Sequence, residues 1–174
     1  MNILDSTAND LMMFYEIYNF ITYEAELLDD ARYQEWFQLF TEDIKYQIPV
    51  RTTRYKKDGD GISNKMFHVD DDYHILDKRV RRIQSKSAWS ENPPSRTRHV
   101  ISNIRFISSE KDNEYLVKSN FILYRNRGDI PAYDIISGER QDVLRKLDGN
   151  LKIAYRKVLI DQSNLSMHNL GVFL

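Results

Sequence analysis

The four histidines are the side chains on which metal chemistry could depend. They are His68, His74, His99 and His168, and none forms an i,i+4 pair on a predicted helix or an H-E-x-x-H motif. A set of two histidines and one carboxylate would have to assemble from residues far apart in the sequence. The chain has no cysteine, so it cannot provide the two cysteines that a Rieske cluster requires besides two histidines. We predict no metal-binding and no cofactor-binding residue in this chain.

Acid–base catalysis in a pocket is the alternative chemistry. The groups suited to it, because burial could shift their pKa values, are Asp29, Asp30, Asp43, Tyr46 and His99. A structural interpretation competes with this one: Asp30 would cap a helix, Asp43 would lie at the exposed start of a strand, and Tyr46 would belong to the core. We favour the structural interpretation, and the chain has no Gly-rich phosphate loop and no nucleophile elbow. The predicted set of catalytic residues is therefore empty.

The most unusual stretch is WSENPPSRTRH, residues 89–99. Its two prolines fix a rigid, extended approach to a strand, and two arginines two positions apart would point to the same side of that strand. Tryptophan and arginine on a rigid backbone are typical of interface hot spots. The alternative is a structured connector whose arginines pair with local carboxylates. We predict a subunit interface that includes Trp89, Pro93, Pro94, Arg96, Arg98 and, from the apolar segment at residues 170–174, Phe173.

The first half of the chain predicts helices around one strand. A helix is expected over residues 9–28, and its buried face would carry Phe14, Ile17, Tyr18, Ile21, Ala25 and Leu28. A second helix, capped by Asp30, would present Tyr33, Trp36, Phe37 and Phe40. Alternating residues 44–51 predict a strand, at an edge or with a bulge at Pro49. Residues 52–65 predict a long exposed loop, and residues 71–85 a helix with acids at its start and arginines at its end.

From Thr97 onward the pattern predicts four antiparallel strands. The faces expected to be buried carry Val100, Ile104 and Phe106, then Tyr115, Val117, Phe121 and Leu123, and in the last strand Leu151, Ile153, Tyr155 and Leu159. We expect a bulge at Gly138 and a tight hairpin at Asp148-Gly149. Helices placed early and a meander placed late predict an α+β fold, in which a curled sheet wraps the helices as a cone with a pocket at its open end.

The composition predicts one soluble domain spanning residues 1–174. The chain has 174 residues, of which 41% are hydrophobic, and a net charge of -1, which argues against nucleic acid or anionic membrane as a partner. The first ten residues do not read as a signal peptide, and no apolar run approaches the ~20 residues needed to span a bilayer. We expect a cytoplasmic protein. Aromatic residues make up 12% of the chain, which indicates a wide packed sheet or a large interface.

Three segments resemble a known family. They are EAELLDDARYQEWFQLFTEDIKYQIPVRTTR at residues 24–54, WSENPPSRTRHVISNI at 89–104 and HNLGVFL at 168–174. They are similar to the small (β) subunit of aromatic-ring-hydroxylating dioxygenases, in particular the biphenyl, polycyclic-arene and phenylpropionate branch. The likeness runs over nearly the whole chain, although KKDGDG in the loop at residues 52–65 matches no common pattern of the family.

The resemblance implies a cone-like fold of the nuclear-transport-factor-2 or cystatin-like type. It also implies assembly with a catalytic α subunit as an α3β3 hexamer, on which a ferredoxin and a reductase act. The Rieske [2Fe-2S] cluster and the mononuclear non-haem Fe(II) would both reside in α. The family offers no catalytic motif to place on this chain.

Our leading hypothesis is therefore a non-catalytic β subunit of an oxygenase that cis-dihydroxylates aromatic hydrocarbons, acting as a scaffold. Two alternatives stay open at this point. One is a stand-alone dehydratase or isomerase of the same fold that uses a pocket Asp or His, and the other is a small-molecule binding module. A pocket filled by Tyr and Phe side chains would argue against the enzyme.

Overall fold

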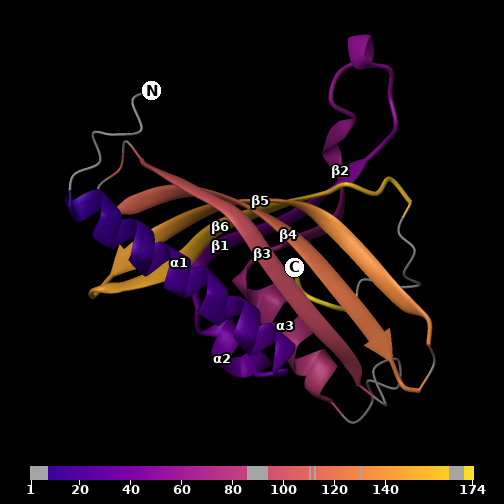
Figure 1. Cartoon of the computed structure of the whole chain (residues 1–174), viewed down its shortest axis with the longest axis horizontal. Coiled ribbons are helices and arrows are strands. Elements are labelled where there is room, and N and C mark those ends of the chain that lie inside the picture. The colour runs from indigo at the N-terminus through magenta and orange to yellow at the C-terminus, as the bar shows by residue number, and fades with distance from the viewer. Residues whose placement is uncertain (1–7, 86–93, 110, 112, 130, 165–170) are drawn as a thin grey trace.

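The computed structural model describes residues 8–85, 94–109, 111, 113–129, 131–164 and 171–174. In chain order the elements are α1 (Ala8–Asp29), α2 (Tyr33–Phe37), β1 (Phe40–Arg51), the 3-10 turn η1 (Lys56–Asp58), β2 (Ile62–Asp71), α3 (Tyr73–Gln84), β3 (Ser95–Ser108), β4 (Glu114–Arg127), β5 (Tyr133–Leu147) and β6 (Asn150–Ile160). The strands form one sheet in the order β2-β1-β6-β5-β4-β3, and the three α-helices gather on one side of it (Figure 1). The predicted α+β class and the curled sheet are confirmed.

Helix α1 runs along the edge strand β3. It carries exposed apolar residues in addition to those that it buries in the core. Ile17, Ile21 and Leu28 are buried as predicted, whereas Phe14 and Tyr18 are exposed. Hydrophobic residues therefore lie on two faces of this helix, one toward the core and one toward solvent. Among the described residues, no helix combines the length and the apolar character needed to cross a membrane.

The second helix is shorter than predicted and is capped differently. Asp30 does not cap it: the N-cap residue is Arg32, and no side-chain hydrogen bond caps this end. Ala31 takes a left-handed backbone conformation, φ 57°, that ends α1 and redirects the chain. Phe40 already begins β1, so only Tyr33, Trp36 and Phe37 of the predicted aromatic stripe lie on the helix.

Strand β1 lies inside the sheet, parallel to β6 and antiparallel to β2. Its pairing with β2 shifts on both sides of Pro49, which confirms the bulge rather than the edge position. The prediction of a loop through residue 65 was wrong, because β2 begins at Ile62. This edge strand is mostly exposed and polar, so it carries little of the alternation that marks a half-buried strand. The shorter connection at residues 52–61 projects from the body of the molecule (Figure 1).

Helix α3 follows as predicted, with Leu76 and Val80 on its buried face. The carboxylate of Asp72 accepts a hydrogen bond from the amide of Ile75 at 2.9 Å and caps the helix. Arg81 and Arg82 occupy the last turn, where they offset the partial negative charge of the helix end.

Two irregularities in the long strands change which residues face the core. The β3–β4 register shifts between Ser102 and Arg105, beside Asn103 with φ 52°, so Val100 points away from the core while Ile104 and Phe106 are half-buried. The β5–β6 register shifts between Val143 and Leu144. Consecutive residues Ile153 and Ala154 of β6 are therefore both buried. Beyond Ala154, the positions of β6 that face inward and outward are exchanged. Arg156 therefore faces inward in place of Tyr155.

Two glycines behave differently from one another. No register shift occurs at Gly138, so the predicted bulge is wrong. A Cβ at this position would lie 2.3 Å from the carbonyl oxygen of Leu159, which means that the glycine permits a close approach of two strands. The predicted hairpin is confirmed at Asp148 and Gly149, with φ of 49° and 82°.

Candidate functional site

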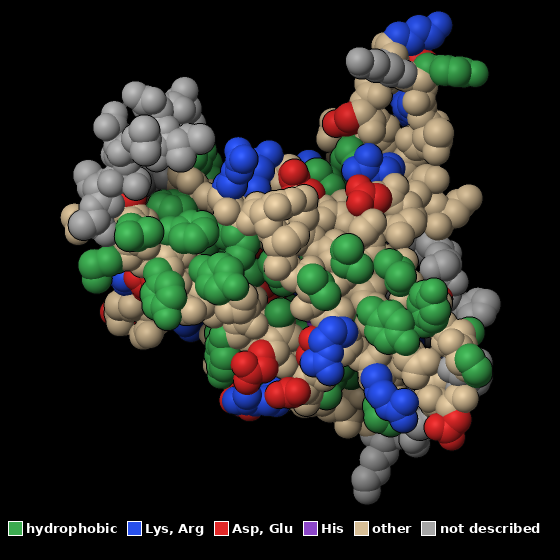
Figure 2. Space-filling model, viewed as in Figure 1, with side chains coloured by type: hydrophobic (Ala, Val, Ile, Leu, Met, Phe, Trp, Pro, Cys, Tyr) green, Lys and Arg blue, Asp and Glu red, His purple; other side chains and the backbone are tan. Residues whose placement is uncertain are grey.

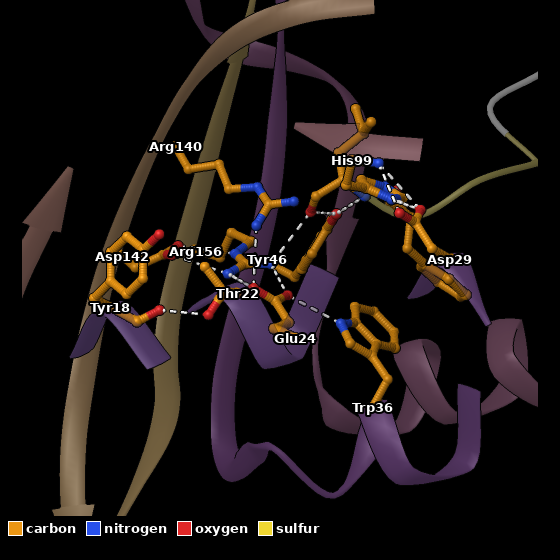
Figure 3. Close-up of polar contacts among 12 residues, drawn as sticks. Tyr18, Thr22, Glu24, Asp29, Trp36, Tyr46, His99, Arg140, Asp142 and Arg156 are labelled. Atoms are coloured by element: carbon orange, nitrogen blue, oxygen red, sulfur yellow. Dashed lines mark hydrogen bonds and ion pairs between the residues drawn. The ribbon is translucent and has the colours of Figure 1, made fainter. Parts of the chain in front are cut away.

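The interior, where an enzyme of this shape would hold its pocket, contains a cluster of four buried charged side chains. Glu24 of α1 lies between Trp36 and the arginines Arg140 and Arg156 of the sheet (Figure 3). The Trp36 indole donates to Glu24 at 3.0 Å, and Arg140 donates to it at 3.1 Å. Arg156 donates to both oxygens of Glu24 and, at 2.8 and 2.9 Å, to Asp142 beside it on the sheet. We call Glu24, Arg140, Asp142 and Arg156 the ionic cluster.

The ionic cluster is balanced electrostatically. Burial alone would raise the pKa of Glu24, but the charges of Arg156 and Arg140, with hydrogen bonds from Arg156 and Trp36, lower it to about 2. Burial lowers the pKa of Arg156, but Asp142 and Glu24 outweigh it and raise that pKa well above its ordinary value. Two carboxylates therefore face two guanidinium groups. Glu24 stays ionised at neutral pH, so this carboxyl has no proton to donate to a substrate.

Residues 172–174 lie in the interior beside the ionic cluster. The Tyr46 hydroxyl donates to the backbone oxygen of Leu174 at 2.6 Å and accepts from the Leu174 amide at 3.0 Å. The Phe173 ring is 4.3 Å from the Trp36 ring, centroid to centroid, and the Arg79 guanidinium lies 5.0 Å from the Phe173 centroid. Phe173 is 2% exposed. The ring therefore packs inside its own chain, and little of it is left for the predicted subunit interface.

A cavity of about 340 Å³ lies between α1 and β3. Three of the predicted acid–base residues line it: Asp29, Asp30 and His99. The imidazole Nδ1 of His99 is 2.6 Å from Asp29, and Nε2 is 3.1 Å from the carbonyl oxygen of Phe173. Burial opposes ionisation of Asp29, but hydrogen bonds from the His99 ring and amide outweigh it and hold the pKa of this carboxyl below its usual range. Both ring nitrogens face acceptors within the chain, so the pair joins α1 to residues 171–174 and offers a ligand no free base.

The remaining acid–base candidates lie elsewhere. Asp43 accepts from Arg145 at 2.9 and 3.0 Å near the surface, and Tyr46 is in the sealed interior. The structure therefore does not gather the five residues into one catalytic site. No group of three histidines or acids that could hold a metal ion occurs among the residues that the structure describes.

Besides the buried Phe173, the predicted interface residues divide into two groups. Trp89 and Pro93 lie outside the described residues. Pro94, Arg96 and Arg98 are exposed, and the two arginines share one face of the edge strand β3. Within the described part of the chain, Arg98 makes one ion pair, 3.6 Å from Asp29, with most of its side chain still in solvent.

The same outer face carries an apolar patch that sequence reasoning missed. Strand pairing places Val100 opposite Ile122, and Tyr124 opposite Ile135, on the side of the sheet away from the core. With Tyr133 these side chains are 39–61% exposed. Figure 2 shows hydrophobic side chains gathered on this view of the molecule, over α1 and over the strands. We call Val100, Ile122, Tyr124, Tyr133 and Ile135 the outer patch; patches of this kind mark interaction surfaces.

Comparison with known proteins gives a consistent result. Residues 23–167 match the family described as "Ring hydroxylating beta subunit". The β subunit of biphenyl 2,3-dioxygenase from Rhodococcus jostii is 44% identical, over 94% of this chain and 90% of its own length. That of benzene 1,2-dioxygenase from Pseudomonas putida is 43% identical, over 91% and 87%. The chain belongs to the ring-hydroxylating β-subunit family.

Solved structures confirm the fold expected of this β subunit. A chain of naphthalene 1,2-dioxygenase with indole bound in the active site superposes with a TM-score of 0.82, covering 100% of both chains at 24% identity. A putative scytalone dehydratase from Novosphingobium aromaticivorans superposes with a TM-score of 0.64, over 90% and 89% of the two chains, at 18% identity. The nuclear-transport-factor-2-like cone is therefore shared with enzymes, but the sequence relatives are dioxygenase β subunits, and the dehydratase alternative is not favoured.

Proposed function

We propose that this β subunit is the non-catalytic scaffold of a terminal oxygenase that cis-dihydroxylates aromatic hydrocarbons. Its partner is the catalytic α subunit, in an α3β3 hexamer to which a ferredoxin and a reductase supply electrons. The observation that carries the proposal is the contrast between a cone interior closed by the chain's own residues and an apolar, arginine-flanked outer face.

The donor set of the chain supports placing the redox groups in α. A Rieske [2Fe-2S] cluster takes two cysteines, and this chain has none. Mononuclear non-haem Fe(II) is bound by two histidines and one carboxylate, which occupy one face of its coordination sphere. The described residues bring no such set together. These residues do not fit either group, so no step of the oxidation is assigned to them.

The interior supports a structural role. In an enzyme of this fold the cone must admit a substrate, and here Phe173, Leu174, Trp36 and the ionic cluster occupy that space. Their hydrogen-bond partners belong to the same chain, such as Tyr46 for Leu174 and His99 for Phe173. The α1–β3 cavity is lined by several ionisable groups, but its histidine, His99, is paired with Asp29 at 2.6 Å.

The surface supports assembly. Burying the outer patch against a partner would remove apolar area from water, and the adjacent Arg96 and Arg98 could pair bidentately with partner carboxylates. We place Trp89, Pro93 and Pro94 at the same interface because they precede β3 directly in the chain. Tryptophan and arginine are the residues that most often dominate such contacts.

The test is co-expression with the α subunit from the same organism, followed by affinity purification and a mass measurement of the complex. We expect α and β in equal amounts and a mass that corresponds to three of each. Trp89→Ala should weaken assembly more than it lowers the stability of the isolated β chain, and Arg81→Ala, an exposed change on α3, is the control. Failure of the wild-type chains to co-purify contradicts the proposal. Unfolding of the Trp89→Ala chain would instead place Trp89 in the core.

A further inference from the structure

The two arginines of the ionic cluster are equally buried but use their N–H groups very differently. Both Arg140 and Arg156 are 0% exposed. Arg156 donates five hydrogen bonds, two to Glu24, two to Asp142 and one to the backbone oxygen of Leu174. That accounts for every N–H of its guanidinium group. Among the described residues, Arg140 donates a single hydrogen bond, from Nη1 to Glu24 at 3.1 Å.

The unpaired atoms of Arg140 have a matching neighbour. Within the part of the chain that the structure describes, the buried side-chain atoms that lack a hydrogen-bond partner are Arg140 Nε, Arg140 Nη2 and Ser119 Oγ. Ser119 of β4 is the residue directly opposite Arg140 of β5, so the two side chains stand on the same face of the sheet as neighbours. Ser119 is 1% exposed. All three atoms therefore belong to one cross-strand pair.

The chemistry of this pair selects a small ligand that can accept two hydrogen bonds. Nε and Nη2 form the side fork of the guanidinium group, which presents two parallel N–H donors. The ring of Phe121 lies 5.6 Å from the guanidinium carbon, so it adds an apolar neighbour and no lone pair for the fork. Leaving such donors unpaired in the interior lowers stability, so a ligand that accepts from both is favoured.

Burial and charge further restrict which ligands can bind at this pair. Because Arg140 and Ser119 are closed off from the surface, neither a partner side chain nor a substrate reaches them. The cluster already contains two carboxylates and two guanidinium groups, so an added anion would leave an uncompensated buried charge. A neutral molecule with one oxygen satisfies both conditions.

We infer that one buried water molecule binds between Arg140 and Ser119. Its oxygen accepts from Arg140 Nε and Nη2, and one of its hydrogens bonds to Ser119 Oγ. Three contacts of this kind are the usual number for an internal water. The water pairs two more of the five N–H groups of Arg140 and so helps to hold Nη1 on Glu24, which fixes α1 to the sheet. The inference rests on the interior alone and is independent of the proposed function.

A crystal structure of the wild-type α–β complex at about 1.8 Å resolution or better tests the inference, because ordered waters are visible there. We expect a density peak within hydrogen-bond distance of all three atoms. A second crystal soaked in sodium bromide should show no anomalous signal at this position. A bromide peak would overturn the neutral ligand, and a protein group or no density at the fork would overturn the site.

Solution measurements on the isolated chain provide a second readout. Oxygen-17 relaxation dispersion counts long-lived internal waters, and Ser119→Val should remove one of them by filling the space with methyl groups. Ser119→Ala should keep the water on the fork, and it remains informative if the valine variant does not fold. Ser102→Val, at an exposed position of β3, is the matched control and should leave the count unchanged. An unchanged count in Ser119→Val contradicts the inference.

Discussion

The inside and the outer face of the cone each depart from the usual arrangement of charged side chains outside and apolar side chains inside. Inside, the ionic cluster places four charged side chains where apolar ones are the rule, and pairs them. Outside, the outer patch and the solvent-facing side of α1, including Leu11, Met12 and Tyr15, expose apolar side chains. Among the described residues, the buried charges pair mostly with one another, and Arg140 and Ser119 keep unpaired atoms, whereas the outer patch stays in contact with solvent.

We expect the largest loss of stability from removing Glu24, the carboxylate that both buried arginines contact. Glu24→Ala should destabilise the isolated chain by about 3–5 kcal/mol, because two guanidinium groups would remain buried with one carboxylate. Denaturant unfolding measures this loss. Glu26→Ala, two residues along the same helix and mostly exposed, should change stability by less than about 1 kcal/mol. Equal effects of the two substitutions would mean that the ionic cluster is not a buried unit.

Phe173→Ala should cost the isolated chain about 3 kcal/mol or more, since it leaves a cavity between Trp36 and Tyr33. The matched control is Tyr133→Ala in the exposed outer patch, which should leave stability nearly unchanged. Thermal and denaturant unfolding give both values. If Phe173→Ala weakens binding to α while stability is retained, the ring belongs to the interface after all.

Acid should weaken the interior in a defined range. The folded-state pKa of Glu24 is about 2, against 4.5 for an ordinary glutamate. The carboxylate therefore stabilises the fold fully above pH 4.5, and this contribution is lost as the pH falls through 2. The shift corresponds to roughly 3 kcal/mol. Unfolding experiments between pH 5 and 2 should show a steeper loss for wild type than for Glu24→Gln, and parallel curves would refute the assignment.

Ile122→Lys tests the outer patch. A charge in the middle of a buried interface should weaken binding to the α subunit at least ~10-fold, or about 1.4 kcal/mol, with little change in the stability of the isolated chain. Lys118→Ala, on the same strand face and outside the patch, is the control. Titration calorimetry or size-exclusion chromatography of mixtures measures the difference. Undiminished binding would move the interface to another face.

Arg98→Ala should have the smallest effect, a few-fold loss of affinity for α. Its single ion pair with Asp29 is 3.6 Å long and mostly exposed, so the stability of the chain should change by less than about 1 kcal/mol. The same binding assay, repeated at high salt, should shrink the difference from wild type. A salt-independent loss would point to lost packing rather than lost charge.

The fold could be predicted largely because its strands and helices carry clear periodic patterns. β4 alternates from Leu116 to Arg125, and α3 combines a buried stripe with an N-cap aspartate. The prediction failed where a local irregularity changes the phase. One extra residue near Asn103 turns Val100 outward, and another near Ala154 turns Arg156 inward. No propensity rule marks either position before the pairing is known.

The candidate site was less accessible to sequence reasoning. Asp29 and His99 were both named, but they meet only because α1 packs on β3, 70 positions away. Arg140 and Asp142 do carry a signal, since they fall in phase with the buried positions Ile136 and Leu144 of β5. Charged residues at such positions indicate a buried ion pair. Their partner Glu24 comes from a helix face that otherwise reads as apolar, which is why the cluster was missed.

The most direct test of the scaffold role compares the isolated β chain with the assembled oxygenase. Both are assayed for bound iron by elemental analysis and for oxidation of biphenyl and benzene in the presence of reductase, ferredoxin and dioxygen. We expect iron and arene cis-diol formation from the α–β complex, and neither from the β chain alone. Product or stoichiometric iron in the isolated chain would contradict the account.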